Sequence, residues 1–273
     1  KGWTCSNGVN VTDGNKINLP LGKQTECTVT NDDDTAAITL IKQLGATYGS
    51  TMPNTAWTLY AKDQAENTVL SGATGISGNV NAGSYNLSES FILGWESNGW
   101  NCGDFGSSNN GLISLSLNLG DNAACTITNS AIQPRIKVIK HVVDQYGGGK
   151  TASDFSMTVT GTNVTLTPGN TGTASSQTFS GSETGTYVYM DVGSYEVTET
   201  AIPGYTQTRS PDCSGTIDVG DIDRVCTITN TAQPPKLTVY KKVINDDGGT
   251  KRISDFKLYV DGRYVKSGTA NDY

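Results

Sequence analysis

A five-residue segment that begins with cysteine and ends with asparagine recurs three times in the 273-residue chain, as CTVTN at 27–31 and as CTITN at 125–129 and 226–230. After a short linker, each copy is followed by a strand-like stretch that ends in lysine: AITLIK at 37–42, RIKVIK at 135–140 and KLTVYK at 236–241. A third segment occurs twice, as GSYNLSE at 83–89 and GSYEVTE at 193–199. Such recurrence is typical of a chain built from tandem copies of one folding unit.

The repeats divide the chain into four parts. We predict complete units at 36–129 and 136–230, the end of a preceding unit at 1–31 and the start of a following unit at 236–273. Two arrangements are open for the partial ends: they belong to a longer tandem array, or they complete each other between chains and build a head-to-tail filament. Two of the linkers contain proline, which stiffens a connection, so we expect a rod rather than a flexible tether.

The composition favours an all-β fold and argues against several kinds of function. Glycine is abundant, with 32 residues, and hydrophobic residues make up only 35% of the chain, a balance typical of strands joined by many turns. The formal charge of −7 argues against nucleic acid as a partner, because that binding depends on Lys and Arg neutralising phosphates. His141 is the only histidine, which rules out a multi-histidine metal site. No apolar run is long enough to span a membrane, and we expect neither a metal nor a cofactor.

The six cysteines form three well-separated pairs, and the second member of each pair opens the recurring five-residue segment. No CxxC motif is present, which argues against a zinc or redox site. An even number of paired cysteines indicates disulfide bonds and an extracellular compartment. Pairing within repeats would join Cys5 to Cys27, Cys102 to Cys125 and Cys213 to Cys226.

The strand-like segments place one polar residue at the end of each apolar stripe. Alternate residues of a strand face the same side, so the stripe of Ile38 and Leu40 ends in Lys42, and two further stripes end in Glu89 and Asn129. The second complete unit repeats this trio as Lys140, Glu199 and Asn230. A lone buried charge is costly, so we expect the three side chains to meet in the core. The alternative is that each lies at a strand end and reaches water by snorkelling.

The order of these residues resembles a known family. The chain has lysine on the first strand, then GxYxxxE with PGY after it at 203–205, then asparagine on the last strand. This order is similar to that of the collagen-adhesin B-type (Cna B-like) domains of bacterial surface adhesins and pilins. The SpaA-like prealbumin type, which also carries the CTITN ending, resembles this chain most. The resemblance covers essentially the whole chain and implies tandem, Ig-like, seven-stranded Greek-key β-sandwiches. The first unit departs from the pattern, because LGW stands at 93–95 where PGY is expected.

The resemblance also implies a spontaneous isopeptide bond between lysine and asparagine, promoted by glutamate. Burial lowers the pKa of an amine, which can then attack the amide carbonyl in its neutral form. Burial also raises the pKa of a carboxyl group, which can then polarise that carbonyl and shuttle protons. Carried over to this sequence, the bonds would be Lys42 to Asn129 with Glu89, and Lys140 to Asn230 with Glu199.

Five further residues are candidates for covalent modification. Lys241 and Asn31 have the right types in the partial ends, with partners outside the chain or in a neighbouring copy. Glycosylation sequons stand at Asn10, Asn86 and Asn163, and they would be used only in a host that glycosylates. Alternation places Asn86 on the outward face of its strand.

Together these features predict a non-enzymatic extracellular structural protein: a surface stalk, fibre or pilus-like filament whose partners are further copies or repeats of itself. The alternative is an adhesin that binds a glycan or host protein through the first complete unit, which carries Trp57, Trp95 and Trp100. Aromatic surfaces can bind sugars, although large aromatic residues more often belong to the core. A secreted glycosidase is the weakest candidate, because Glu89 and Glu199 fall in separate repeats and do not flank one bond.

Overall fold

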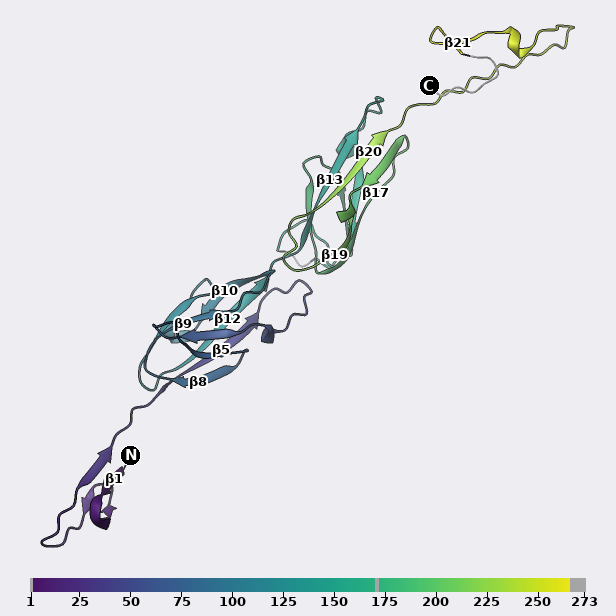
Figure 1. The fold of residues 1–273 in the computed structure, drawn as a ribbon. Helices are drawn as coiled ribbons and strands as arrows, with labels where there is room; N and C mark the ends of the chain where they lie inside the picture. Colours follow the sequence, from purple (N-terminus) through teal and green to yellow (C-terminus); the bar gives the residue numbers. More distant parts are fainter. Residues whose placement is uncertain (1, 170–171, 266–273) are drawn as a thin grey trace. The chain divides into compact units, whose positions relative to one another are not determined.

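The computed structural model describes residues 2–169 and 172–265, and its regular structure is almost entirely β-strand (Figure 1). Two β-sandwiches, at 36–131 and 135–232, hold most of the strands, and each consists of two four-stranded sheets. The predicted all-β class with tandem β-sandwiches is therefore confirmed. Of the predicted units, residues 1, 170–171 and 266–273 lie outside the described residues.

The first sandwich is organised around a parallel pair formed by its first and last strands. One sheet has the order β10 (Trp95–Asn101), β12 (Asn122–Ala131), β5 (Ala36–Leu44) and β8 (Ile76–Val80). The facing sheet has the order β11 (Ile113–Leu117), β9 (Gly83–Glu89), β6 (Leu59–Lys62) and β7 (Thr68–Gly72). Strands β5 and β12 run parallel, and every other pair in these two sheets is antiparallel.

The second sandwich repeats this topology. One sheet has the order β16 (Thr186–Tyr189), β13 (Arg135–Val143), β20 (Arg224–Ala232) and β18 (Tyr205–Arg209). The facing sheet has the order β15 (Ser176–Ser180), β14 (Ser156–Thr160), β17 (Gly193–Glu199) and β19 (Ser214–Ile217). Strands β13 and β20 are again a parallel pair of first and last strands.

Each sandwich therefore has eight strands, one more than the seven that the resemblance implies. The additional strands are β11 and β19, which lie between the cysteine-bearing turn and the last strand. Each pairs antiparallel with the strand that carries the glutamate, β9 or β17, and so extends the second sheet by one strand. The extra strand forms because the segment before the last strand can satisfy its backbone hydrogen bonds on that open sheet edge.

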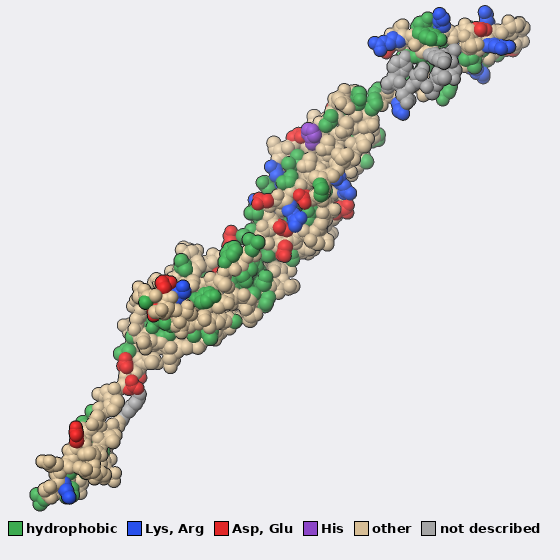
Figure 2. Space-filling view, in the orientation of Figure 1, with side chains coloured by type: hydrophobic (Ala, Val, Ile, Leu, Met, Phe, Trp, Pro, Cys, Tyr) green, Lys and Arg blue, Asp and Glu red, His purple; other side chains and the backbone are tan. Residues whose placement is uncertain are grey.

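The core of each sandwich consists of the inward-facing residues that the period-two pattern predicts. On β5, the side chains of Ile38 and Leu40 are completely buried, and the intervening residues are not. The second core is built in the same way from Ile136, Val138 and residues of the facing sheet such as Val197. The outward positions are rich in Ser, Thr and Asn, so the face seen in Figure 2 is mainly uncharged, with acidic and basic groups scattered over it.

In the described residues of the two terminal segments, the strands form only short pairs. At the N-terminal end, β1 (Gly2–Cys5) pairs with β4 (Cys27–Thr30), and β2 (Val11–Thr12) pairs with β3 (Lys16–Ile17), with a 3-10 turn at Ser6–Gly8. At the C-terminal end, β21 (Leu258–Val260) pairs with β22 (Arg263–Val265).

The strand expected at 236–241 is not formed, and its apolar residues Leu237 and Val239 are exposed. The equivalent strand β13 is hydrogen-bonded to the parallel last strand β20. Among the described residues, no such partner strand lies beside 236–241. Val29, on the N-terminal segment, shares a strand face with Cys27 and is likewise exposed. Both segments have alternating apolar residues in their sequence, but no facing sheet within the described structure covers these residues.

Candidate functional site

The parallel pairing of the first and last strands brings lysine and asparagine to the same end of the sandwich core. Lys42 on β5 is paired with Ile127 on β12, two residues before Asn129. In the second sandwich Lys140 is paired with Ile228, again two residues before Asn230. Because alternate strand residues share a face, lysine and asparagine lie diagonally across the ladder and both point inward.

In the first sandwich, the glutamate of the facing sheet links the two residues. Lys42 is 1% exposed and Asn129 is 3% exposed. The Nζ of Lys42 lies 2.6 Å from Oε2 of Glu89, and the Nδ2 of Asn129 donates a 2.7 Å hydrogen bond to Oε1 of the same carboxylate. One carboxylate therefore contacts both the amine and the amide.

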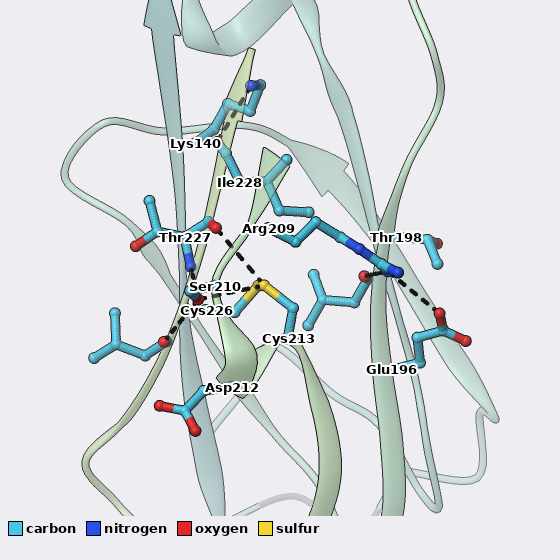
Figure 3. The surroundings of a disulfide bond; sticks show 12 residues. Lys140, Glu196, Thr198, Arg209, Ser210, Asp212, Cys213, Cys226, Thr227 and Ile228 are labelled. Carbon is cyan, nitrogen blue, oxygen red and sulfur yellow. Dashed lines mark hydrogen bonds and ion pairs between the residues drawn. A yellow bond between two sulfur atoms is a disulfide. The ribbon is translucent and has the colours of Figure 1, made fainter. Parts of the chain in front are cut away.

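In the second sandwich the same trio is even more completely enclosed. The side chains of Lys140 and Glu199 are both 0% exposed and their Nζ and Oε2 atoms lie 3.2 Å apart. Asn230 donates a 2.6 Å hydrogen bond from Nδ2 to Oε1 of Glu199. Lys140 also donates to the backbone carbonyl of His141, at 3.0 Å, and to that of Ile228, at 3.3 Å (Figure 3). The interpretation that these residues reach water at strand ends does not fit this burial.

The amide carbonyls of the two asparagines are buried and have no hydrogen bond to any part of the chain that the structure describes. This holds both for Oδ1 of Asn129 and for Oδ1 of Asn230. Buried polar atoms normally have one, so an unpaired acceptor at the same place in both sandwiches calls for an explanation. In both sandwiches the glutamate contacts the amide nitrogen of the asparagine and not its carbonyl oxygen, so the expected polarisation of that carbonyl by the carboxyl group is not formed in this arrangement.

Burial also sets the protonation of the amines. It lowers the pKa of Lys42 and of Lys140 below the ordinary lysine value, because desolvation of the ammonium outweighs the opposing effect of the glutamate partner. A lowered pKa makes the neutral, nucleophilic amine more accessible. Glu89, which accepts a hydrogen bond from Lys42, and Glu199, which forms an ion pair with Lys140, are also positioned to take the proton of the lysine.

An aromatic ring lies against each lysine, a feature that we did not assign to the site from the sequence. Lys42 Nζ lies 4.6 Å from the ring centroid of Trp57, and Lys140 Nζ lies 4.3 Å from that of Phe155. Each ring directly follows a three-residue 3-10 helix, Asn54–Ala56 or Ala152–Asp154. The signal available in the sequence was the repeated SDF at 153–155 and 254–256.

A second ring backs the first one in both sandwiches. Trp95 meets Trp57 edge to face at 5.2 Å, and Tyr205 meets Phe155 in the same way at 5.5 Å. Trp95 and Tyr205 are the last residues of LGW and PGY. The first unit has LGW in place of PGY, but Trp95 makes the aromatic contact beneath the lysine that Tyr205 makes in the second unit.

The partial ends show fragments of the same arrangement. Lys241 Nζ lies 4.2 Å from the ring centroid of Phe256, which follows the 3-10 turn Ile253–Asp255. Asn31 is exposed. Among the described residues, neither is brought together with a glutamate and a reaction partner.

The three disulfide bonds join the pairs that repeat-internal pairing predicts: Cys5–Cys27, Cys102–Cys125 and Cys213–Cys226. In the second sandwich the bond ties the turn before β19 to β20, the strand that also carries Asn230 (Figure 3). The last strand of each sandwich thus carries both a disulfide cysteine and the asparagine of the trio.

The tryptophans of the first sandwich do not form a sugar-binding surface. Trp57 and Trp100 are each 1% exposed and Trp95 is 5% exposed, and Trp100 donates from its Nε1 to the carbonyl of Gly111. The idea that these rings grip a ligand from the surface was wrong, because all three are packed into the core.

The sequons lie in different settings. Asn10 is exposed. Asn86 faces outward, is half-buried and accepts a 2.6 Å hydrogen bond from Ser114. Asn163 donates from Nδ2 to the buried carboxylate of Asp191 at 2.7 Å, which engages the atom that a glycan would modify.

Two further observations concern the described part of the chain as a whole. It contains no group of three or more His, Cys, Asp or Glu side chains placed to hold a metal ion. Its helices are single 3-10 turns, and none is long and apolar enough to cross a membrane.

Comparison with known proteins agrees with this architecture. The sequence profile of the SpaA prealbumin-like fold domain matches residues 33–127 and again 133–233. Similar solved structures include the Bacillus anthracis TIE protein, at 12% identity over 85% of this chain and 47% of that one, with a TM-score of 0.45. This chain therefore spans about half the length of the TIE structure.

Two pilus proteins are also similar. The major pilin T-13 of Streptococcus pyogenes matches at 16% identity over 75% of this chain and 98% of that one, with a TM-score of 0.32. A C-terminal fragment of the pilus adhesin SpaC from Lactobacillus rhamnosus GG matches at 14% identity over 74% and 98%, with a TM-score of 0.35. Among curated proteins, none matches this sequence. Since two copies of the matched domain cover well over half of its length, the chain belongs to the SpaA prealbumin-like fold domain family.

Proposed function

We propose that this protein is a non-enzymatic, extracellular structural protein, in which β-sandwich repeats that cross-link themselves form a surface stalk, fibre or pilus-like filament. The observation that carries the proposal is the buried trio of lysine, glutamate and asparagine, present with the same register in both sandwiches. A buried pair of charges is weak evidence for stability alone. Its recurrence beside an amide with an unpaired carbonyl supports a chemical role.

The reaction is an amide exchange that balances without any further reagent. The glutamate takes a proton from the lysine ammonium, and the neutral Nζ attacks Cγ of the asparagine. The new C–N bond forms, the bond from Cγ to Nδ2 breaks, and the proton held by the carboxyl group passes to the departing nitrogen, while the attacking nitrogen gives up a second proton to the same carboxylate. Ammonia leaves, so the products are one secondary amide, one ammonia and a protonated glutamate. Each residue reacts once, which is why we describe the chain as self-modifying and not as an enzyme.

The positions of the bonds suit a load-bearing protein. A bond from Lys42 to Asn129 would join β5 to β12, and one from Lys140 to Asn230 would join β13 to β20. These are the first and last strands of each sandwich, through which tension on the chain enters and leaves the fold. A covalent link between them would carry that tension past the hydrogen-bonded core. The disulfides, which fit an oxidising compartment outside the cytoplasm, add a second restraint.

The proposal includes the division into repeats at 36–129 and 136–230, with partial repeats at 1–31 and 236–273. It also includes self-association, with further copies or repeats as the partners. In this arrangement Lys241 and Asn31 react with residues outside the chain. The stack of Lys241 on Phe256 supports the assignment of Lys241, because it reproduces the contact of both complete sites.

The test is the intact mass of the protein with and without reduction. Each cross-link lowers the mass by one ammonia, about 17 Da, and peptide mapping should place the losses at Lys42–Asn129 and Lys140–Asn230. Glu89→Gln should abolish the first loss and keep the second, while Glu66→Gln, an exposed control, should keep both. A mass equal to the unmodified chain less the hydrogens of its disulfides would contradict the proposal.

A further inference from the structure

The hydroxyl of Tyr205 is buried and makes no hydrogen bond within the described structure. A tyrosine hydroxyl usually finds a partner when it leaves water. Burying it without a partner is unfavourable, so the other contacts of the Tyr205 side chain must compensate for this cost.

The hydroxyl is enclosed by the glycine-rich loop at 144–149, which follows β13. A Cβ atom added at Gly148 would lie 2.2 Å from the hydroxyl oxygen of Tyr205 and 2.9 Å from its Cζ. The loop is held in this position by Asp144, whose carboxylate accepts 2.6 Å hydrogen bonds from the backbone N–H groups of both Gly148 and Gly149. Only a residue without a side chain allows the loop to close so tightly on the ring.

The loop, the two rings and the reactive amine form one continuous stack. Gly148 lies on the hydroxyl end of Tyr205, the Tyr205 ring packs edge to face on Phe155 at 5.5 Å, and Phe155 lies 4.3 Å from Lys140 Nζ. On another side, a Cβ at Gly181 would lie 2.7 Å from Cγ of Lys140. The lysine is thus enclosed by two glycine contacts, one direct and one through the aromatic rings.

The loop conformation is encoded locally. In the C-terminal segment, Asn245 and Gly249 occupy the places of Asp144 and Gly148 in the ungapped alignment of 134–159 with 235–260. A Cβ at Gly249 would meet Oδ1 of Asn245 at 2.9 Å, just as one at Gly148 would meet Oδ1 of Asp144 at 3.0 Å. Among the described residues, the three atoms nearest to the Cβ at Gly249 all belong to Asn245, so the glycine contact forms within the loop itself, and we infer that the Tyr205 ring packs against a preformed surface.

From these contacts we propose that the 144–149 loop is a cap that keeps water out of the second cross-linking site, with Gly148 and Tyr205 as positioning residues. The cap holds Tyr205 and Phe155 over the lysine, so the amine and the amide stay aligned. It also excludes water, which strengthens the electrostatic interactions within the site. This inference rests on the proposed cross-linking function. It assigns a role to GGG at 147–149 that its composition alone, typical of a turn, does not suggest.

The first sandwich supplies an internal comparison. Its ring at the equivalent register position is Trp95, paired with Ala131 as Tyr205 is paired with Ala232. The segment after β5 reads GATYGS at 45–50 and lacks the triple glycine. A change in the contact of Gly148 with Tyr205 should therefore affect the second site and leave the first site of the same molecule unaffected.

The test is Gly148→Ala in the full chain. Gly148 is not in the left-handed region, whereas Gly147 and Gly149 are, at φ of +72° and +74°, so the added methyl acts through collision and not through backbone strain. The protein is made in an oxidising cell-free reaction, aliquots are quenched in acid, and the cross-linked peptides are quantified by mass spectrometry. We expect cross-linking of Lys140 to Asn230 to slow by about tenfold or more, since small displacements of reacting groups cost that much.

Two further variants distinguish positioning from a general loss of structure. Tyr146→Ala changes a half-exposed side chain of the same loop and should leave both rates unchanged. Adding Tyr205→Phe to Gly148→Ala removes the atom that the methyl meets first, and should recover a substantial part of the lost rate.

Three outcomes would overturn the inference: a wild-type rate at the second site in Gly148→Ala, an equal slowing of both sites, or no recovery in the double variant. If the wild-type chain loses no ammonia at either site, the proposed function fails together with the inference. The first three results would leave the cross-linking proposal standing.

Discussion

Replacing Asn230 with alanine removes one reacting group of the second sandwich and leaves the ion pair of Lys140 with Glu199 in place. Lys140 and Asn230 are 90 residues apart. In the chain-entropy model, a covalent link that closes a loop of this size stabilises a fold by about 4 to 5 kcal/mol. The free energy of unfolding of this sandwich should therefore fall by about 4 to 5 kcal/mol.

The assay is guanidinium unfolding of the full chain, followed by a probe for each sandwich, with the intact mass measured on the same samples. The first sandwich should unfold as in the wild type, and Thr229→Ala, a neighbouring change on β20, should keep both the cross-link and the stability. A decrease no larger than about 1.5 kcal/mol is what the loss of a typical non-covalent contact would give. That result, in a chain whose wild type has lost two ammonias, would refute the argument that the bond stabilises by restraining the unfolded chain.

Three other outcomes follow from the structure. In Asn129→Ala, which cannot cross-link the first site, Lys42 keeps a lowered pKa in the folded state. Between that pKa and 10.5 the unfolded chain binds more protons than the folded one, so thermal stability should rise with pH over this range. Adding Lys42→Met should remove the rise. Replacing Cys102 and Cys125 with alanine opens a loop of 23 residues and should lower the free energy of unfolding by about 3 kcal/mol, measured by the same denaturation; no change would show that the bond is dispensable. Trp95→Phe should leave the binding profile on a glycan array unchanged, because the ring is buried; a binding signal that disappears in this variant would contradict the assignment of the tryptophans to the core.

The sequence alone was sufficient for the residues that the strand period controls. Alternation placed Lys42 and Asn129 on inward faces, and both are buried. It succeeded because one face of each strand is packed against a second sheet, so a shift of one residue would expose the whole apolar set. The same rule failed for Leu237 and Val239, which alternate correctly but are exposed, because alternation describes a strand that already has partners.

The sequence was less informative about residues that act from loops. Trp57 was noted as a position equivalent to the phenylalanine of SDF, but its contact with Lys42 depends on how a 3-10 turn directs the ring into the core. Trp95 carried no local signal of burial. Large aromatic residues occur both in cores and on binding surfaces, and only packing distinguishes the two.

The sequence by itself determined the repeat, the all-β class, the pairing of the cysteines and the identity of the trio, because all of these are written in local patterns that recur along the chain. Only the tertiary structure decided that one carboxylate contacts both the amine and the amide, and that a glycine loop closes on Tyr205 above them. Those contacts join residues that are 40 or more positions apart, or join a loop to a strand of the same sandwich. Their distances depend on how two sheets pack face to face, which no single segment encodes.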